Sequence, residues 1–506
     1  SSVTKLGERA FNSCNNLTEV QLNEGLEVIE ECAFALCITL QSVDVPSTVY
    51  KLERGAFGGC SSLVEVHLNE GLQVVEETAF GSTALRFVTL PSSVTELGTG
   101  AFAFCSNLIE VQSNDGLRII GEAAFAYCET LVEVKLSEGL RVIGDQAFQD
   151  CKALRSVTIP STVNKLGNDA FCYCSNLAEV HLNDGVQVIG NNAFGSCTSL
   201  QSVAIPSTVT EWGYGAFEGC SNLAEVKLTE GLQVIGEAAF SNTALRLVTL
   251  PSTVTELGMG AFSSCTNLIE VQLNEGLQTI GEAVFANCFG LPRVIIPSTV
   301  TRLAMDCFEA CGDLSEVIFL GGERLLDKTF LARGIFSEEQ GLLDREALDK
   351  MLYDEDRNFA FSDYPLPAVK ISISWAVSER MARLSTSCRA AVEEGIRNQR
   401  CLELTQHGDV FAEFRMFFPF YNVDDDIFVQ DRGLETARSV YKVLQTIAFH
   451  ELRESSIVIE LAMWKSRIYG DRARADCRVA VPGPVKCLIM EYCGFKGFLR
   501  PAMEGD

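Results

Sequence analysis

Cysteine is the residue type in this sequence with the most potential for chemistry, with 20 copies in 506 residues. Twelve stand three residues after a phenylalanine, as in AFEGC at 216–220. They are Cys14, Cys37, Cys60, Cys105, Cys128, Cys151, Cys174, Cys197, Cys220, Cys265, Cys288 and Cys311. Zinc needs four converging ligands, commonly in CxxC or HxxxH spacings, and one CxC at Cys172 and Cys174 does not supply them. We expect an inert, buried series, because free cysteine packs as a small hydrophobic residue.

The cysteines also bear on the cellular compartment. Stacked strands about 4.8 Å apart are within reach of a disulfide, but side chains that all point the same way fit its dihedral angle poorly. Free thiols in this number favour a reducing location, and we expect an intracellular, cytoplasmic protein. An extracellular location is the alternative, because the sequence begins at Ser1 inside a repeat and an N-terminal segment would be missing from view.

Other candidate motifs lie in the last third of the sequence. HELRE at 450–454 lacks the second histidine of the zinc-protease motif HExxH. Three aspartates at 424–426 lack the alternate spacing and the glycine of a calcium loop. Cys477, Cys487 and Cys493 have no nearby histidine, and burial is favoured over a zinc site. Since P-loop, GxSxG and complete dinucleotide motifs are also missing, we predict no catalytic residue, no metal and no cofactor.

An internal repeat must position the cysteines. Fourteen copies align on a phenylalanine that usually follows alanine, 23 residues apart except for two steps of 22. The phenylalanines are Phe11, Phe34, Phe57, Phe80, Phe102, Phe125, Phe148, Phe171, Phe194, Phe217, Phe240, Phe262, Phe285 and Phe308. One unit of 23 residues cannot bury its own apolar side chains, so neighbouring units must stack and share a core. The pattern predicts a solenoid over residues 1–330.

Each unit predicts two short strands and one helical turn. In LAEVHL (177–182), apolar residues alternate with Glu179 and His181, which indicates a strand with one buried face. VQVIG (186–190) supplies the second strand after a turn. Ala193, Phe194 and Cys197 then lie at i, i+1 and i+4, on one side of a helical turn. A β-rich solenoid follows, and with the C-terminal part the fold class is α+β.

The segments at 205–223 and 250–268 carry much the same IPSTVTxLGxGAFxxCxxL unit, and this unit resembles the BspA-type leucine-rich repeat. The resemblance covers about residues 1–320. It implies a curved or twisted leucine-rich solenoid, and it implies binding or adhesion rather than a reaction.

A larger duplication is visible within the repeats. Units 160 residues apart match, and LVTLPSTVTELGMGAF (247–262) echoes FVTLPSSVTELGTGAF (87–102). The two shortened loops, GSTAL (81–85) and SNTAL (241–245), also fall at equivalent places. An active site must hold its groups within about 0.5 Å, and a duplication of seven repeats is not expected in a protein built around such a site. A long binding surface tolerates this duplication.

Composition limits the partners. The formal net charge is −27 at pH 7, which repels nucleic acid and anionic lipid. No apolar run reaches the roughly 18 residues of a membrane-spanning helix, so membrane insertion is not expected. A protein partner is predicted, with a basic one favoured by the acidic surface.

The outward positions of the first strand form a polar stripe with an acidic lean. One column holds Glu19, Glu65, Glu110, Glu133, Glu179, Glu225 and Glu270, and the next holds Gln21, His67, Gln112, Lys135, His181, Lys227 and Gln272. Units of the second kind insert Ser42, Phe87, Ser156, Ser202, Leu247 and Arg293 between most of the glutamates. The stripe is either a docking surface for a protein or solvated filler that was copied with the repeat.

Residues 331–506 predict a separate, mainly α-helical domain that also covers the open end of the solenoid. Helices are expected at 374–397, 432–450, 455–468 and 485–493, with a further one after Ser337 and a cap at Asp431. FHELRESSIVIELAMWKSRI (449–468) and CRVAVPGPVKCLIMEYCGF (477–495) resemble a tail found behind repeat arrays in proteins of unicellular algae.

The whole sequence favours a non-enzymatic protein-binding scaffold or adaptor. A secreted or surface adhesion protein is the alternative, which the family resemblance suggests. A second alternative is an unrecognised enzymatic activity in residues 331–506.

Overall fold

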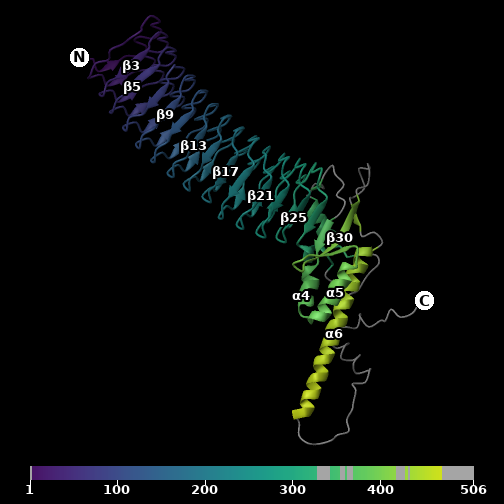
Figure 1. Cartoon of the computed structure of the whole chain (residues 1–506). Coiled ribbons are helices and arrows are strands. Elements are labelled where there is room, and N and C mark those ends of the chain that lie inside the picture. Colours follow the sequence, from purple (N-terminus) through teal and green to yellow (C-terminus); the bar gives the residue numbers. More distant parts are fainter. Residues whose placement is uncertain are drawn as a thin grey trace. The chain divides into compact units, whose positions relative to one another are not determined.

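The computed structural model describes residues 3–327, 342–353, 359–361, 369–417, 428–430 and 434–469. The chain forms two compact units, shown in Figure 1. The first unit comprises Ser1–Pro292, Thr299–Leu314 and Leu352–Tyr364, and the second comprises Arg293–Ser298, Ser315–Met351 and Pro365–Asp506. The domain boundary at residues 330 and 331 stays a prediction.

The first unit is a solenoid whose repeats each contribute two short strands, as predicted. Figure 1 shows the longer strands as a row of successive arrows. These first strands are β3 (Ser42–Val45), β5 (Glu65–Leu68), β7 (Phe87–Thr89), β9 (Glu110–Gln112), β11 (Glu133–Lys135), β13 (Ser156–Thr158), β15 (Glu179–His181), β17 (Ser202–Ile205), β19 (Glu225–Leu228), β21 (Leu247–Thr249) and β23 (Glu270–Gln272).

The second strands are two residues long and pair with each other on another side of the solenoid. They are β1 (Lys5–Leu6), β2 (Val28–Ile29), β4 (Lys51–Leu52), β6 (Val74–Val75), β8 (Glu96–Leu97), β10 (Ile119–Ile120), β12 (Val142–Ile143), β14 (Lys165–Leu166), β16 (Val188–Ile189), β18 (Glu211–Trp212), β20 (Val234–Ile235), β22 (Glu256–Leu257), β24 (Thr279–Ile280) and β26 (Arg302–Leu303). The strands β1 to β18 of this series form one parallel sheet.

Successive repeats pair in parallel and in register, which is what the predicted stacking requires. Val203 of β17 is opposite Val226 of β19, and Val188 of β16 is opposite Glu211 of β18. Within β17, exposed and buried residues alternate, with Val203 and Ile205 buried. The parallel pairing joins residues one repeat length apart, so each side chain lies beside the equivalent side chain of the next turn.

The expected helical turn has a different form. The N–H groups of Gly195 and Cys197 donate to carbonyl oxygens three residues earlier, at 2.8 and 3.3 Å, whereas those of Phe194 and Ser196 donate to the next repeat at 2.8 and 2.7 Å. Ser196 has a φ of 56°, in the left-handed region. Alternate N–H groups therefore serve the neighbouring turn, and an α-helix cannot form. The described residues Val3–Phe319 contain none.

The repeated phenylalanines form one continuous stack through the first unit, within the shared core that the repeat predicts. From Phe11 to Phe308 and then Phe361, neighbouring ring centroids lie 5.1–5.7 Å apart and the planes differ by 1–15°. Every ring of the series from Phe34 to Phe285 is at most 1% exposed. The stack is the core of the solenoid.

A short segment from the C-terminal part of the sequence closes this stack. The N–H groups of Asp306 and Phe308 donate to the carbonyl oxygens of Phe359 and Ala360, both at 3.0 Å, and the ring of Phe361 stacks on Phe308 at 5.1 Å. In the preceding repeats these N–H groups reach the next turn. Residues 359–361 thus take the place of a further turn and keep the last phenylalanine buried, at 2% exposure.

The second unit contains a mixed sheet as well as helices. Its strand order is β25 (Arg293–Ile296), β27 (Glu316–Phe319), β28 (Val369–Ser372), β30 (Val410–Phe417) and β29 (Leu402–Leu404), and β31 (Phe428–Gln430) also pairs with β30. The pairs β25·β27 and β27·β28 are parallel and the others antiparallel. The sheet adds to the helices expected in residues 331–506; in VKIS (369–372), Val369 and Ile371 are buried on one face, which is strand periodicity.

The helices among the described residues are α1 (Gly322–Leu325), α3 (Arg345–Leu352), α4 (Ser374–Ala382), α5 (Thr386–Arg397) and α6 (Glu435–Tyr469). The expected helix at 374–397 is two helices that separate at Arg383–Ser385, and the two helices expected at 432–450 and 455–468 are one. No glycine or proline interrupts residues 435–469, so the helix continues. The helix at 485–493, Ser337 and Asp431 lie outside the described residues.

Candidate functional site: the outward strand face

The outward side chains of the first strands form a continuous surface of the first unit, here called the strand face. Its two main columns contain the fourteen candidate residues predicted above. All are exposed except Glu110, which is half-buried. Inward neighbours such as Val134, Val157 and Val180 are at most 7% exposed. The strands therefore separate a solvated polar face from the core as expected.

Glutamates alternate with short residues along most of the first column. Ser42 is opposite Glu65, and Ser202 lies between Glu179 and Glu225. This register relieves repulsion between like charges, which would be destabilising in directly opposite positions.

The alternation fails once, where Glu110 is opposite Glu133. There Lys135 places its Nζ 2.7 Å from Glu110 Oε1 and 3.4 Å from Glu133 Oε1. The hydrogen bond to Glu110 raises the pKa of Lys135. A single lysine thus bridges the one adjacent pair of glutamates in this column and reduces the repulsion between them.

His67 is also engaged within the face. Its Nδ1 lies 2.7 Å from Asp44 Oδ1 and its Nε2 lies 3.5 Å from Glu65 Oε1. Asp44 is exposed and belongs to the second column, opposite His67. Asp44 belongs to the second kind of repeat, whose outward residues are not among the fourteen predicted ones.

Two large apolar side chains interrupt the acidic columns. Phe87 is 54% exposed and lies opposite Glu110, and Leu247 is 45% exposed and lies opposite Glu270. The guanidinium of Arg86 lies 5.7 Å from the centre of the Phe87 ring. In the sequence these positions read only as spacers between glutamates. Both are exposed apolar side chains beside glutamates.

Phe87 and Leu247 each follow an interruption of the strand ladder. Among the described strands, β5 does not pair with β7 and β19 does not pair with β21. These two breaks fall at the repeats that are one residue short, after Phe80 and Phe240. A third break, between β11 and β13, lies between repeats of full length.

The cysteine series is structural, as expected. The thiols from Cys37 to Cys311 are free and buried, and each Sγ–H donates to the carbonyl oxygen of the phenylalanine one repeat earlier, as Cys220 does to Phe194 at 3.1 Å. Burial raises the pKa of the Cys60 thiol to about 12. A protonated thiol without solvent access cannot act as a nucleophile.

Threonine replaces cysteine in the two short repeats. Thr83 Oγ1 donates to Phe80 O at 2.9 Å and lies 3.1 Å from Cys105 Sγ, and Thr243 makes the same contacts with Phe240 and Cys265 at 2.9 and 3.2 Å. Both threonines stand three residues after the phenylalanine, which the sequence already showed. A small hydrogen-bonding side chain is what this position requires, and sulfur itself is dispensable.

Glu451 and Glu454 of the HELRE segment have structural partners in the second unit. Arg380 holds Glu451 with two hydrogen bonds of 3.0 and 2.6 Å, which joins α4 to α6. Glu454 accepts the N–H of Ser385 at 2.9 Å just before α5, and these bonds lower its pKa. The two carboxylates therefore connect helices. In the described part of the chain, no three His, Cys, Asp or Glu side chains converge as metal ligands would.

The described helices include none that combines the length and apolar character needed to cross a membrane. This applies also to α6, although it is 35 residues long.

Comparison with known proteins identifies the repeats. A family model described as BspA type leucine rich repeat region, six copies, matches residues 1–109, 100–224 and 187–315. The solved structure of a leucine-rich repeat protein from Bacteroides ovatus is similar, with a TM-score of 0.50 and 26% identity over 59% of this chain and 79% of that one. A search of curated proteins found no match.

Two further solved structures are similar at lower scores. A leucine rich cell surface protein from Faecalibacterium prausnitzii has a TM-score of 0.35 and 27% identity over 49% of this chain and 77% of that one. A leucine-rich repeat protein from Eubacterium ventriosum has a TM-score of 0.42 and 24% identity over 58% and 83%. The phenylalanine and cysteine series account for the repeated residues of this sequence. The family model covers residues 1–315, which is more than half of the sequence, so the chain belongs to the BspA-type leucine-rich repeat family.

Proposed function

We propose that the chain is a non-enzymatic protein-binding scaffold and that a protein partner docks on the strand face. The observation that supports this proposal is the placement of Phe87 and Leu247, which are exposed apolar side chains within acidic columns. Buried apolar anchors surrounded by polar residues are typical of protein interfaces. Repeat proteins of this kind use extended surfaces for binding.

The candidate contact residues are those of the two polar columns. They are Glu19, Gln21, Glu65, His67, Glu110, Gln112, Glu133, Lys135, Glu179, His181, Glu225, Lys227, Glu270 and Gln272. The chemistry of this face selects a partner that offers apolar side chains between lysines or arginines. The two anchors are seven repeats apart, about 34 Å at the strand-stacking distance, so one extended partner or two copies of one module can engage both.

The free, buried thiols favour a reducing compartment for this function. The intracellular location therefore stays our prediction.

The test is quantitative capture by the full chain. Wild type, a strand-face variant with Phe87→Ser and Leu247→Ser, and a control with Phe289→Ser are immobilised and exposed to extract of the source cells. Phe289 is 47% exposed and lies directly after Cys288, outside the strand face. We expect specific proteins to be retained by wild type and control and lost by the strand-face variant. Equal retention by all three would reject the strand face as the docking surface.

A further inference from the structure

A second surface of the solenoid runs along the turns that follow each buried phenylalanine. The residue two positions after the phenylalanine has a left-handed φ in all fourteen repeats, between 53° and 73°. Five of the fourteen are residues that favour this conformation, namely Gly59, Asp150, Gly219, Asn242 and Asn287, and four are the small residue serine, namely Ser13, Ser82, Ser196 and Ser264. Glycine, asparagine and aspartate visit the left-handed region most readily, and bulky residues do so least.

Three aromatic residues occupy this unfavourable position in the middle of the solenoid. Phe104, Tyr127 and Tyr173 each have a φ of 60°. For a bulky residue such a conformation is an outlier. Burial does not compensate for the strain, because the three side chains are 55%, 37% and 51% exposed.

The internal duplication shows that the backbone does not need these rings. The residues 160 positions away are Ser264 for Phe104, Asn287 for Tyr127 and Ser13 for Tyr173. All three have the same left-handed conformation, with φ of 58°, 59° and 59°. The aromatic residues are therefore not a consequence of the internal duplication. A strained, exposed side chain that the fold does not require points to a functional role.

The rings present open aromatic surface along the solenoid axis. Phe104 and Tyr127 come from consecutive turns and stack at 4.7 Å with planes 3° apart. Their outer faces are therefore directed toward the adjacent turns, where the equivalent residues are the short Ser82 and Asp150. Tyr173 follows two turns after Tyr127, about 10 Å away at the stacking distance, and Asp150 lies between them.

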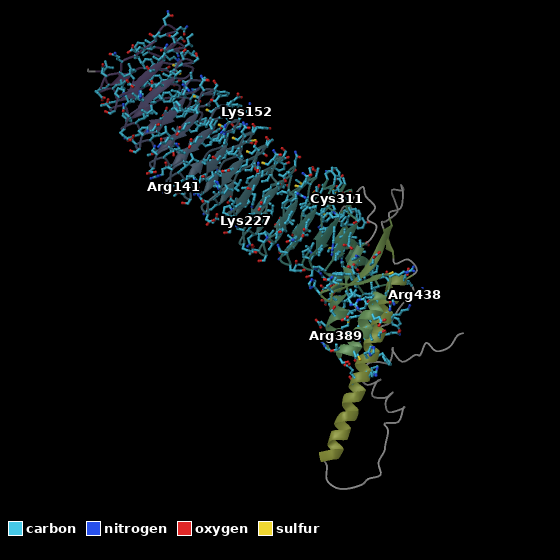
Figure 2. All side chains as sticks on the ribbon, in the orientation of Figure 1. Arg141, Lys152, Lys227, Cys311, Arg389 and Arg438 are labelled. Carbon is cyan, nitrogen blue, oxygen red and sulfur yellow. The ribbon has the colours of Figure 1, made fainter. Side chains whose placement is uncertain are left out.

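Two carboxylates lie in the same turns: Glu129 follows Tyr127 by two residues, and Asp150 lies between Tyr127 and Tyr173 in the sequence. They share one ammonium group, since Lys152 Nζ lies 2.7 Å from Glu129 Oε1 and 3.5 Å from Asp150 Oδ1. Two carboxylates beside one lysine leave a net negative charge, and the Glu129 side chain, at 54% exposure against 18% for Asp150, is the one open to a further cation. Lys152 lies on the long side of the solenoid away from Arg141 (Figure 2).

We propose that Phe104, Tyr127 and Tyr173, together with Glu129, form a second docking surface, the aromatic edge, which binds arginine side chains of a protein partner. A planar guanidinium stacks on an aromatic face and pairs with a carboxylate, and this edge supplies both groups. The aromatic edge is distinct from the strand face, so the inference does not depend on the proposed function.

The experiment uses the full chain and two synthetic peptides that differ only in replacing each arginine of an arginine-serine repeat with citrulline. The edge variant carries Phe104→Ser, Tyr127→Asn and Tyr173→Ser, the residues of the duplicated positions, and leaves the net charge unchanged. Titration calorimetry at constant salt should show arginine-peptide binding at least ten-fold weaker for the edge variant than for wild type. The thermal midpoint of the edge variant should be equal to or higher than that of wild type.

The strand-face variant Phe87→Ser, Leu247→Ser is the matched control and should bind the arginine peptide as wild type does. An unchanged dissociation constant for the edge variant would overturn the proposal, because charge alone would then explain binding. Equal affinity of wild type for the citrulline peptide would also overturn it and would assign the edge to apolar contacts.

Discussion

The thiol of Cys220 donates a hydrogen bond of 3.1 Å to the carbonyl oxygen of Phe194, one repeat earlier. The same carbonyl accepts the N–H of Cys197 at 3.3 Å. The Phe194 carbonyl therefore receives one bond from its own turn and one from the next. Sulfur links neighbouring turns without any covalent bond, and the result is a ladder of individually weak but regularly repeated interactions.

Alkylation should distinguish the ladder thiols from the partly exposed ones. Burial raises the pKa of Cys60 to about 12, so at pH 8 its thiolate fraction is about one in ten thousand. We expect iodoacetamide to modify Cys14 and Cys32, which are only half-buried, while Cys60 stays unmodified in the folded protein. Peptide mapping by mass spectrometry gives the answer. Labelling of Cys60 at the rate of Cys14 would contradict its burial.

The raised thiol pKa values also predict a loss of stability in alkaline solution. In the unfolded chain a cysteine releases its proton near pH 8.5, whereas folded Cys60 and Cys311 do so at about 12. The unfolded state thus binds fewer protons above pH 8.5, and the free energy of unfolding falls as pH rises toward 12. Each such thiol contributes a fall of about 1.4 kcal/mol per pH unit. Urea unfolding at pH 7, 9 and 10 measures it, and Cys60→Ala should show a shallower fall.

Truncation of one ring should be costly. Phe171 is fully buried and stacks between Phe148 at 5.1 Å and Phe194 at 5.2 Å. We expect Phe171→Ala to lower the free energy of unfolding by about 3–5 kcal/mol, as buried aromatic truncations do. Chemical denaturation of variant and wild type checks this. An exposed ring outside the stack, Tyr214 at 47% exposure, serves as the control, and Tyr214→Ala should change stability by about 0.5 kcal/mol at most. A cost below about 1 kcal/mol for Phe171→Ala would argue against the stack as the core.

Much of the solenoid could be predicted because the structural repeat has the same period as the sequence repeat. Alternation in LAEVHL gave the strand, and the 23-residue period placed equal residues in register. The form of the turn could not be predicted in the same way. The positions of Ala193, Phe194 and Cys197 fit one side of a helix, but the left-handed φ of Ser196 depends on hydrogen bonds to the next repeat. Those bonds are long-range, so local spacing does not contain them.

The candidate site shows the same division. Which residues face outward follows from period two, and the strand face agrees with that prediction. The contribution of an individual position to binding does not follow from this period. Phe87 reads as a spacer in the sequence, and only the parallel register shows that it stands exposed beside Glu110. The strain at Phe104 is likewise invisible until the backbone angle is known.

Residues 359–361 end the phenylalanine stack by offering the last turn two backbone carbonyls and one ring. Every repeat of this kind has the N–H groups and the ring that make these contacts, so the same terminal segment fits arrays of different lengths. Recombination between near-identical repeats could lengthen or shorten the array by whole turns without a new end having to evolve. Natural variants that differ by multiples of about 23 codons are therefore the expected form of divergence for this architecture.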